Sequence, residues 1–166
     1  MVEPAARRPH MPGYGILGAD EGGGLLPWSW AEARLVGSRD YWVATVGADG
    51  APHVMPVWGI WADGHGWFSS SPQSRKSRNI AGDQRVVITS DAPSQPVVVQ
   101  GIAERVHDDG AIADFTHRVN EKYESDLAVS FFTANATFRV RPRVVFGLDE
   151  ADFTGTPTRW EFDGGR

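Results

Sequence analysis

The sequence of 166 residues contains no cysteine, which excludes disulfide bonds, thiolate metal sites and a cysteine nucleophile. It has no uninterrupted apolar run near the roughly 20 residues that a membrane-spanning helix needs. Residues 1–10 also lack the apolar segment of a secretory signal peptide. These absences predict a cytoplasmic protein that has no membrane partner.

Positive charge is scarce as well. The chain has 16 basic and 21 acidic side chains, and the resulting net charge of −5 argues against nucleic acid as a partner. Only Lys76 and Lys122 are lysines, and every other basic side chain is an arginine. Hydrophobic residues make up 41% of the chain, so we expect a single globular domain with its own core.

Known catalytic and metal-binding motifs are missing too. The five histidines show no metal-ligand spacing and no H-E-x-x-H pattern, so we expect no metal site. The sequence has no G-x-S-x-G motif and no P-loop, and Gly22-Gly23-Gly24 precedes any predicted strand. Hydrolase, nucleotidase and Rossmann dehydrogenase chemistry therefore lack their usual sequence machinery.

Glycine and proline recur through residues 1–27 and predict an irregular N-terminal arm. Residues 28–36 then predict a helix. Ser29 is its expected N-cap, Glu32 has the capping-box spacing and Gly37 is the expected stop.

The rest of the chain alternates β-branched and aromatic runs with turn signals. Asp49-Gly50 and Asp63-Gly64 stand between such runs and favour an antiparallel meander. Residues 137–141 and 143–148 predict two separate strands. In all, the pattern predicts a mainly β fold, a small barrel of about six or seven antiparallel strands with two or three short helices.

Two of these helices have recognisable ends. The first starts at Pro72, with Ser71 as its cap, and ends at Gly82. The other follows Asp108 or Asp109. Its apolar side chains at helical spacing are Ile112, Phe115, Val119 and Tyr123.

Hydroxyls and cations gather where the first of these helices begins. They are Ser69, Ser70 and Ser71, followed by Ser74, Arg75, Lys76, Ser77, Arg78 and Asn79. A helix N-terminus has unpaired backbone N–H groups, so its combination with three nearby cations predicts an anion site. Arg75, Arg78 and Asn79 share a helix face, and Lys76 has the reach to join them. The alternative is an ordinary solvated helix face.

Pro56 lies inside a run with strand character. Proline cannot donate a ladder hydrogen bond, so it predicts a strand edge or an interrupted pairing. Backbone groups left free there would be able to meet the polar rim of a flat heterocycle, and the alternative is an ordinary edge strand. The seven tryptophans of the chain leave a similar choice between an aromatic-lined pocket and simple packing.

The order of these motifs resembles the pyridoxamine 5′-phosphate oxidase-like split β-barrel superfamily. The segments that carry the resemblance are DGAPHVMPVW at 49–58, WFSS at 67–70, SRKSRNI at 74–80, RVVIT at 85–89 and VVVQGIAER at 97–105. Within the superfamily, the chain is most similar to the actinobacterial flavin/deazaflavin oxidoreductases, which often use coenzyme F420 in place of FMN. The similarity covers about residues 28–162, so the cofactor-binding barrel is expected in residues 28–166.

The resemblance implies a homodimer with two cofactor sites, each at the subunit interface. The residues expected to hold the cofactor phosphate are Ser74, Arg75, Lys76, Arg78 and Asn79, with the hydroxyls of Ser69, Ser70 and Ser71. Those expected to line the ring are Met55, Pro56, Val57 and Trp58, with Gln100 nearby and Trp28 or Trp30 of the other subunit. The longer anionic tail of F420 needs a basic exit groove, for which Arg78 and Arg85 are candidates.

The implied function is hydride transfer between coenzyme F420, or alternatively FMN, and a small unsaturated or carbonyl substrate. A non-catalytic carrier of a flavin, deazaflavin or haem is the second interpretation. Pyridoxamine 5′-phosphate oxidases proper carry an arginine followed two positions later by a histidine that grips the substrate. Here Arg159 is followed by Trp160 and Glu161, which disfavours oxidation of a B6 vitamer.

Overall fold

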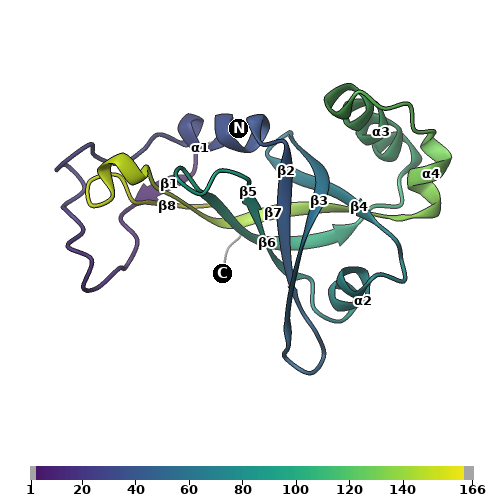
Figure 1. Ribbon diagram of the computed structural model, residues 1–166, viewed down its shortest axis with the longest axis horizontal. Helices are drawn as coiled ribbons and strands as arrows, with labels where there is room; N and C mark the ends of the chain where they lie inside the picture. Colours follow the sequence, from purple (N-terminus) through teal and green to yellow (C-terminus); the bar gives the residue numbers. More distant parts are fainter. Residues whose placement is uncertain (1–2, 163–166) are drawn as a thin grey trace.

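Six antiparallel strands close into a barrel in the computed structural model, which describes residues 3–162 (Figure 1). They are β2 (Asp40–Val46), β3 (Pro52–Ala62), β4 (His65–Ser70), β5 (Arg85–Ser90), β6 (Val97–Arg105) and β7 (Ala136–Gly147). Their order is β7-β4-β3-β2-β5-β6, and the pairing of β6 with β7 closes the ring. The predicted mainly β split barrel is thereby confirmed. Residues 1–2 of the expected arm and 163–166 of the expected domain lie outside the described residues.

Two short strands extend the sheet beyond the barrel. β8 (Thr158–Glu161) pairs with the end of β7, and β1 (Ala5–Arg7) pairs with β8. The described part of the chain therefore has eight strands rather than six or seven. One of them lies in the arm that the sequence predicted to be irregular, because the edge it pairs with exists only once β8 is in place.

Strand β7 is continuous where the sequence predicted two strands. Pro142 does not end it, because β6 and β7 pair on both sides of a register shift between Gln100 and Gly101. Glycine is required at 101, since an added Cβ would lie 2.5 Å from the carbonyl oxygen of Arg141. The prediction was wrong because a bulge arises from the pairing of two strands and not from the sequence of one.

The helices cover the barrel from different sides. They are α1 (Trp28–Gly37), α2 (Arg75–Gly82), α3 (Asp109–Tyr123) and α4 (Val129–Ala134), with a 3-10 turn η1 (Glu150–Asp152). In Figure 1, α3 and α4 lie together on one side of the barrel, above α2, while β1 and the arm lie on the opposite side. The sequence did not predict α4 or η1. None of the described helices is long and apolar enough to cross a membrane.

Helix α1 starts differently from the prediction. Its first residue is Trp28, preceded by Pro27, and no side chain caps it. Ser29 therefore lies inside the helix, and its predicted capping role was wrong. Trp28 is only 7% exposed, so the burial of its indole outweighs an N-cap that contributes about 1 kcal/mol. Gly37 is the last helical residue, as expected.

Helix α2 starts three residues later than predicted. Ser74 and not Ser71 is its N-cap, and the Ser74 Oγ accepts a hydrogen bond from the backbone N of Ser77 at 3.2 Å. The Ser71 Oγ instead accepts one from the backbone N of Gln73 in the preceding turn. For α3 the prediction is confirmed, since Asp108 caps the helix.

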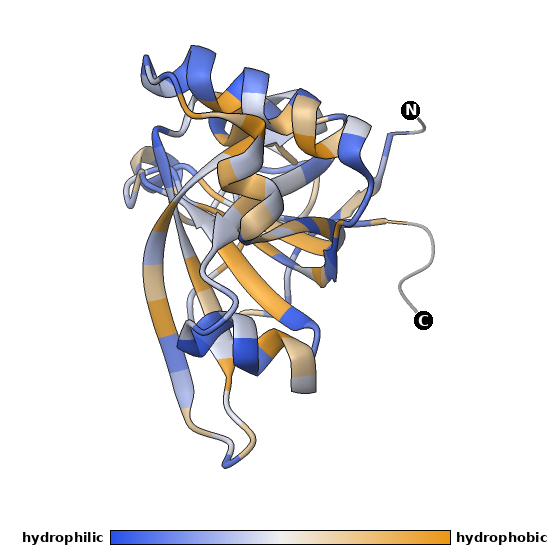
Figure 2. Cartoon of the chain, turned by 90° about the vertical axis from the view of Figure 1, so that its right-hand side faces the viewer, coloured by the Kyte–Doolittle hydropathy of each residue, from blue (hydrophilic) through white to orange (hydrophobic). Residues whose placement is uncertain are grey.

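The apolar core has two parts. One fills the barrel interior, where Val43 and Val99 are fully buried. The other packs α3 and α4 against Ile60 of β3. It contains the apolar face predicted for α3, namely Ile112, Phe115, Val119 and Tyr123. Figure 2 shows apolar residues along α3 and α4, whereas α2 is mostly hydrophilic.

Packing accounts for several tryptophans. Trp28 lies 6.3 Å from Trp61 and 5.8 Å from Trp160, measured between ring centroids, and all three are buried. Its own chain encloses the Trp28 indole, and this burial disfavours the expectation that Trp28 of a second subunit lines a cofactor. Trp30 lies under the guanidinium of Arg34, 3.7 Å from the ring centroid.

Candidate functional site

At the β4–α2 junction, residues 69–79, Lys76 and three serines of the predicted cluster form a connected network. Lys76 Nζ lies 3.4 Å from Ser70 Oγ, which donates to Ser74 Oγ at 2.9 Å. Ser74 Oγ in turn lies 3.0 Å from Ser77 Oγ. The network forms because β4 ends at Ser70 and a four-residue turn brings the chain back to the start of α2.

The three cations of the junction have no acidic partner in the part of the chain that the structure describes. None of Arg75, Lys76 and Arg78 forms an ion pair with a carboxylate within residues 3–162. Arg75 is exposed, and Arg78 donates to the carbonyl oxygen of Gln73 at 2.8 Å. Lys76 is half-buried, and this burial lowers the pKa of its ammonium group. Positive charge is thus concentrated here without compensation.

Other polar side chains of the junction hold the structure together. Asn79 Nδ2 donates to Thr45 Oγ1 at 3.0 Å and so ties α2 to β2. Ser69 Oγ donates to the carbonyl oxygen of Ala136 at 3.3 Å. These contacts occupy two groups that the sequence predicted as ligands, whereas the hydroxyls of Ser70 and Ser74 bond mainly to one another.

The junction fits a phosphate group. Cations with hydroxyl donors are the partners that a phosphate oxygen prefers, and charge-assisted hydrogen bonds are the stronger ones. A dianion placed here would supply the negative charge that Arg75, Lys76 and Arg78 lack and would favour the charged form of the half-buried lysine. No cluster of acidic, histidine or cysteine side chains in residues 3–162 has the arrangement of a metal site.

Strand β3 has one unpaired edge. It pairs with β2 along Pro52–Trp58 and with β4 only along Gly59–Ala62. Pro56 therefore lies on an edge, as predicted, although its pairing with β2 is not interrupted. Val54 and Met55 of this edge are 53% and 48% exposed, although they point to opposite faces. An apolar edge of this kind is typical of an interaction surface.

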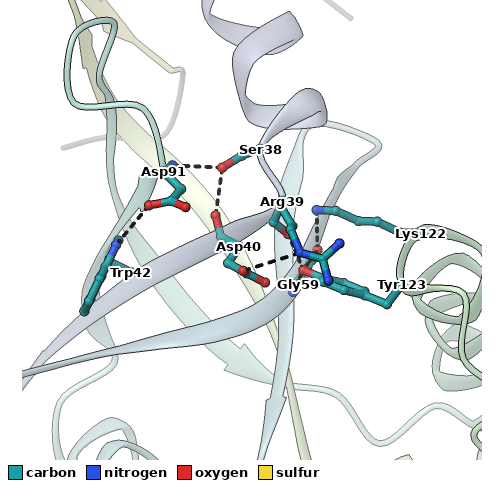
Figure 3. A network of polar contacts seen from close by, with 8 residues as sticks. All are labelled: Ser38, Arg39, Asp40, Trp42, Gly59, Asp91, Lys122 and Tyr123. Atoms are coloured by element: carbon teal, nitrogen blue, oxygen red, sulfur yellow. Dashed lines mark hydrogen bonds and ion pairs between the residues drawn. The ribbon is translucent and has the colours of Figure 1, made fainter.

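Trp58 lies at the end of this edge and packs against α3. Its indole stacks on the ring of Tyr123 with centroids 4.3 Å apart and planes 5° from parallel. The Tyr123 hydroxyl accepts a hydrogen bond from the backbone N of Gly59 at 2.9 Å and contacts the carbonyl oxygen of Arg39 (Figure 3). Burial raises the pKa of Tyr123 to about 12. The phenol of Tyr123 therefore stays protonated at neutral pH. Its ring covers one face of the Trp58 indole.

Lys122 completes this network. Its Nζ donates to the carbonyl oxygen of Gly59 at 2.7 Å (Figure 3). The same Nζ lies 4.7 Å from the ring centroid of Tyr41. Burial lowers the pKa of Lys122 to about 8. The sequence predicted only that Tyr123 belongs to the apolar face of α3. That α3 fixes the backbone beside Trp58 could not be foreseen, because nothing in the local pattern links the two segments.

Two cavities adjoin the junction, and a third lies beside β2, β5 and β6. Trp58 and the serines 69–71 line one of about 340 Å³. A second, of about 650 Å³, includes Arg78, Arg85, Arg105 and Arg143 in its lining. Gln100 lines a third, of about 480 Å³. The structure thus brings Trp58 to the serines, but within one chain it does not bring Gln100 into the same cavity.

The arginine-lined cavity extends the basic surface of α2. The sequence suggested Arg78 and Arg85 for a basic groove, and Asp83 partly neutralises Arg85 at 2.5 Å. Sequence reasoning missed Arg105 and Arg143. They belong to β6 and β7, and only the pairing of these strands brings them to one cavity.

A closed barrel of six antiparallel strands, with a cluster of hydroxyls and cations at the start of α2, defines a split β-barrel fold. The chain belongs to the pyridoxamine 5′-phosphate oxidase family, whose pattern it matches over residues 31–151. No curated protein matches the sequence.

Several solved structures are similar to this chain. An F420 reductase is 27% identical, with a TM-score of 0.58 over 69% of this chain and 94% of that one. An FAD-binding protein from Mesorhizobium loti is 21% identical, with a TM-score of 0.59 over 81% and 94% of the two chains. The haem storage protein HutZ from Vibrio cholerae is 19% identical, with a TM-score of 0.52 over 70% and 87%. The last two similarities concern the fold alone.

Proposed function

We propose that this protein is an oxidoreductase that transfers a hydride between coenzyme F420 and a small unsaturated or carbonyl substrate. The observation that carries the proposal is the positive charge of Arg75, Lys76 and Arg78, which has no ion-pair partner within residues 3–162, beside the hydroxyls of Ser70 and Ser74. The similarity to an F420 reductase supports this choice, and FMN is the alternative cofactor for the same site.

The bound deazaflavin or flavin would supply the hydride chemistry, so the protein needs few reactive side chains of its own. Arg75, Lys76 and Arg78 neutralise the phosphate, while the serine hydroxyls donate hydrogen bonds to it. Trp58 and the neighbouring edge of β3 cover one side of the ring and keep water from it. The arginine-lined cavity beyond α2 suits the longer anionic tail of F420.

A second copy of the chain fits the exposed edge of β3. Val54 and Met55 are half-exposed there, and Gln100 lies in a cavity separate from Trp58. A partner that packs on this edge would cover the apolar surface and would let one cofactor contact both groups. We therefore propose a homodimer with the cofactor at its interface.

Oxidation of a B6 vitamer has less support. The position two residues after Arg159 is Glu161, which pairs with Arg7 at 2.6 Å, and the intervening Trp160 is fully buried. Neither side chain replaces the substrate-binding histidine.

Titration of F420 and FMN by isothermal calorimetry tests the proposal. The double variant Arg75→Ala/Lys76→Ala should bind the cofactor at least about tenfold more weakly, because charge-assisted hydrogen bonds contribute about 1.5–3 kcal/mol each. The matched control is Arg7→Ala/Arg118→Ala, which removes the same charge from two exposed ion pairs elsewhere. Equal affinity in the two double variants would remove the phosphate role. Tight binding without turnover of enones or quinones would favour the carrier interpretation instead.

A further inference from the structure

We propose that the cavity between Trp58, the end of β4 and helices α3 and α4 binds the substrate, and that this substrate is uncharged and planar, with about two fused rings. We name it the α3–α4 cavity. The proposal rests on the proposed function, because it takes the β4–α2 junction as the anchor of the cofactor.

The walls of the α3–α4 cavity are largely aromatic. Trp58, Phe115, Phe131 and Phe132 all line it. Phe115 and Phe131 each meet Phe132 edge-to-face at 5.1 Å, so the three phenyl rings form a continuous surface. Aromatic faces and edges bind other flat rings favourably, and pockets of this composition are typical of small-molecule sites.

The lining of the cavity contains no charged side chain and therefore favours an uncharged ligand. The residues that line the α3–α4 cavity include no Asp, Glu, Lys or Arg. An isolated charge is expensive to move from water into such a place. The neighbouring cavity differs sharply, because Arg78, Arg105 and Arg143 contribute to its lining. The two sides of the β4–α2 junction are thus suited to different ligands, one anionic and one neutral.

The volume sets the size of the ligand. An apolar cavity of about 150 Å³ holds a single benzene molecule. The α3–α4 cavity has about 340 Å³, which is room for about two fused rings. At about 150 Å³ per ring, the three fused rings of a flavin would need about 450 Å³, which is more than the cavity offers. We therefore assign the cofactor ring to the exposed edge of β3 and the substrate to the cavity.

One end of the cavity is polar and adjoins the anion site. Ser70 lines the cavity and also bonds to Ser74 within the network that Lys76 joins. Ser71 Oγ accepts a hydrogen bond from the backbone N of Gln73, which leaves its own proton free to be donated. A carbonyl group of the ligand can accept that proton. Only Ser70 would therefore separate a ligand in the cavity from the cofactor phosphate at the β4–α2 junction.

Equilibrium dialysis with two related quinones tests the proposal. Menadione is an uncharged two-ring compound, and 1,4-naphthoquinone-2-sulfonate is its charged counterpart. The chain has no cysteine with which menadione could react. Leu127→Trp fills the cavity, whereas Val129→Trp adds the same side chain to an exposed position of α4 outside it. Each protein is measured free of cofactor and with oxidised F420 or FMN bound.

The wild-type protein should bind menadione at least about tenfold more tightly than the sulfonate. Leu127→Trp should weaken menadione binding at least about tenfold and Val129→Trp less than about twofold, with unchanged cofactor affinity in both. Equal menadione affinity in the two variants overturns the proposal. So does weaker cofactor binding by Leu127→Trp, since the cavity would then hold the cofactor ring. If the wild type binds menadione as expected but neither cofactor, the proposed function fails and the binding site for neutral ring compounds stands.

Discussion

The indole of Trp58 and the phenol ring of Tyr123 lie almost parallel, with their centroids 4.3 Å apart. Trp58 belongs to the exposed edge of β3, and Tyr123 is the last residue of α3. The Tyr123 hydroxyl also binds the backbone of Gly59, the residue next to Trp58. The orientation of an aromatic wall of the candidate site therefore depends on a helix that covers the barrel from outside.

Substitution of Tyr123 should separate the contribution of ring stacking on Trp58 from that of the hydrogen bond to Gly59. Tyr123→Phe keeps the stacked ring but leaves the buried backbone N of Gly59 without its acceptor, which should lower the free energy of unfolding by about 1–3 kcal/mol. Tyr123→Leu should lower it further, because an aromatic pair contributes about 0.5–1.5 kcal/mol beyond its buried area. Urea unfolding followed by tryptophan fluorescence measures both. A Tyr123→Phe protein as stable as the wild type would contradict the hydrogen-bond role.

The N-cap of α2 offers a direct comparison of two serines. Ser74→Ala should lower the free energy of unfolding by about 1 kcal/mol, because Ser74 Oγ accepts from the first turn of the helix. Ser71→Ala should change it by less than about 0.5 kcal/mol, since Ser71 is exposed and lies before the cap. Chemical denaturation of the two variants under one condition gives the difference. A larger loss of stability for Ser71→Ala than for Ser74→Ala would show that Ser71 caps the helix, as the sequence predicted.

The half-buried ammonium of Lys122 should make stability depend on pH. Its pKa is lowered from 10.5 to about 8 by burial, an effect that Asp40 opposes and Arg39 reinforces. Between these pH values the folded protein binds fewer protons than the unfolded one, so the contribution of Lys122 to stability rises with pH. Wild type should therefore gain stability relative to Lys122→Met as the pH is raised from 8 toward 10.

Urea unfolding at a series of pH values measures this gain. Arg118→Met on the same helix is the control, because Arg118 is paired with Asp114 and stays charged throughout. Its difference from wild type should not vary over the same range. A stability difference for Lys122→Met that is flat from pH 8 to 10 would show that the ammonium is well solvated.

The exposed edge of β3 provides a test of the proposed dimer. Val54→Lys places a charge on the apolar edge and should shift the protein from dimer to monomer in light scattering coupled to size-exclusion chromatography. Val36→Lys is the matched control, since Val36 is 56% exposed on α1, away from this edge. A wild-type protein that is monomeric at all concentrations would remove the dimer, as would a Val54→Lys dimer as stable as that of the control.

Much of the fold could be predicted because its signals are local. The Asp-Gly turns, the apolar face of α3 and the Asp108 cap each lie within one short segment. The same holds for the β4–α2 junction, where Ser70, Ser74 and Lys76 are too close in sequence to lie far apart. The continuous β7 and the cap of α2 were missed because a bulge and a turn outweighed the local preference.

The candidate site depends partly on local sequence and partly on long-range packing. The hydroxyls and cations come from one segment, so their grouping was visible in the sequence. The α3–α4 cavity was not, because its walls come from β3, β4, α3 and α4, which meet only through long-range packing. The same is true of Arg105 and Arg143, which strand pairing brings to the cavity beyond α2.

The sequence by itself determined the strand-and-turn pattern, the lack of thiol chemistry and the charged segment at the start of α2, since each follows from backbone preference or side-chain type at neighbouring positions. Only the tertiary structure decided which aromatic rings are buried, which edge stays open and what the cavities contain. Burial, open edges and cavities depend on which distant segments pack together and exclude water. The periodic pattern of one segment does not specify which other segment it will pack against.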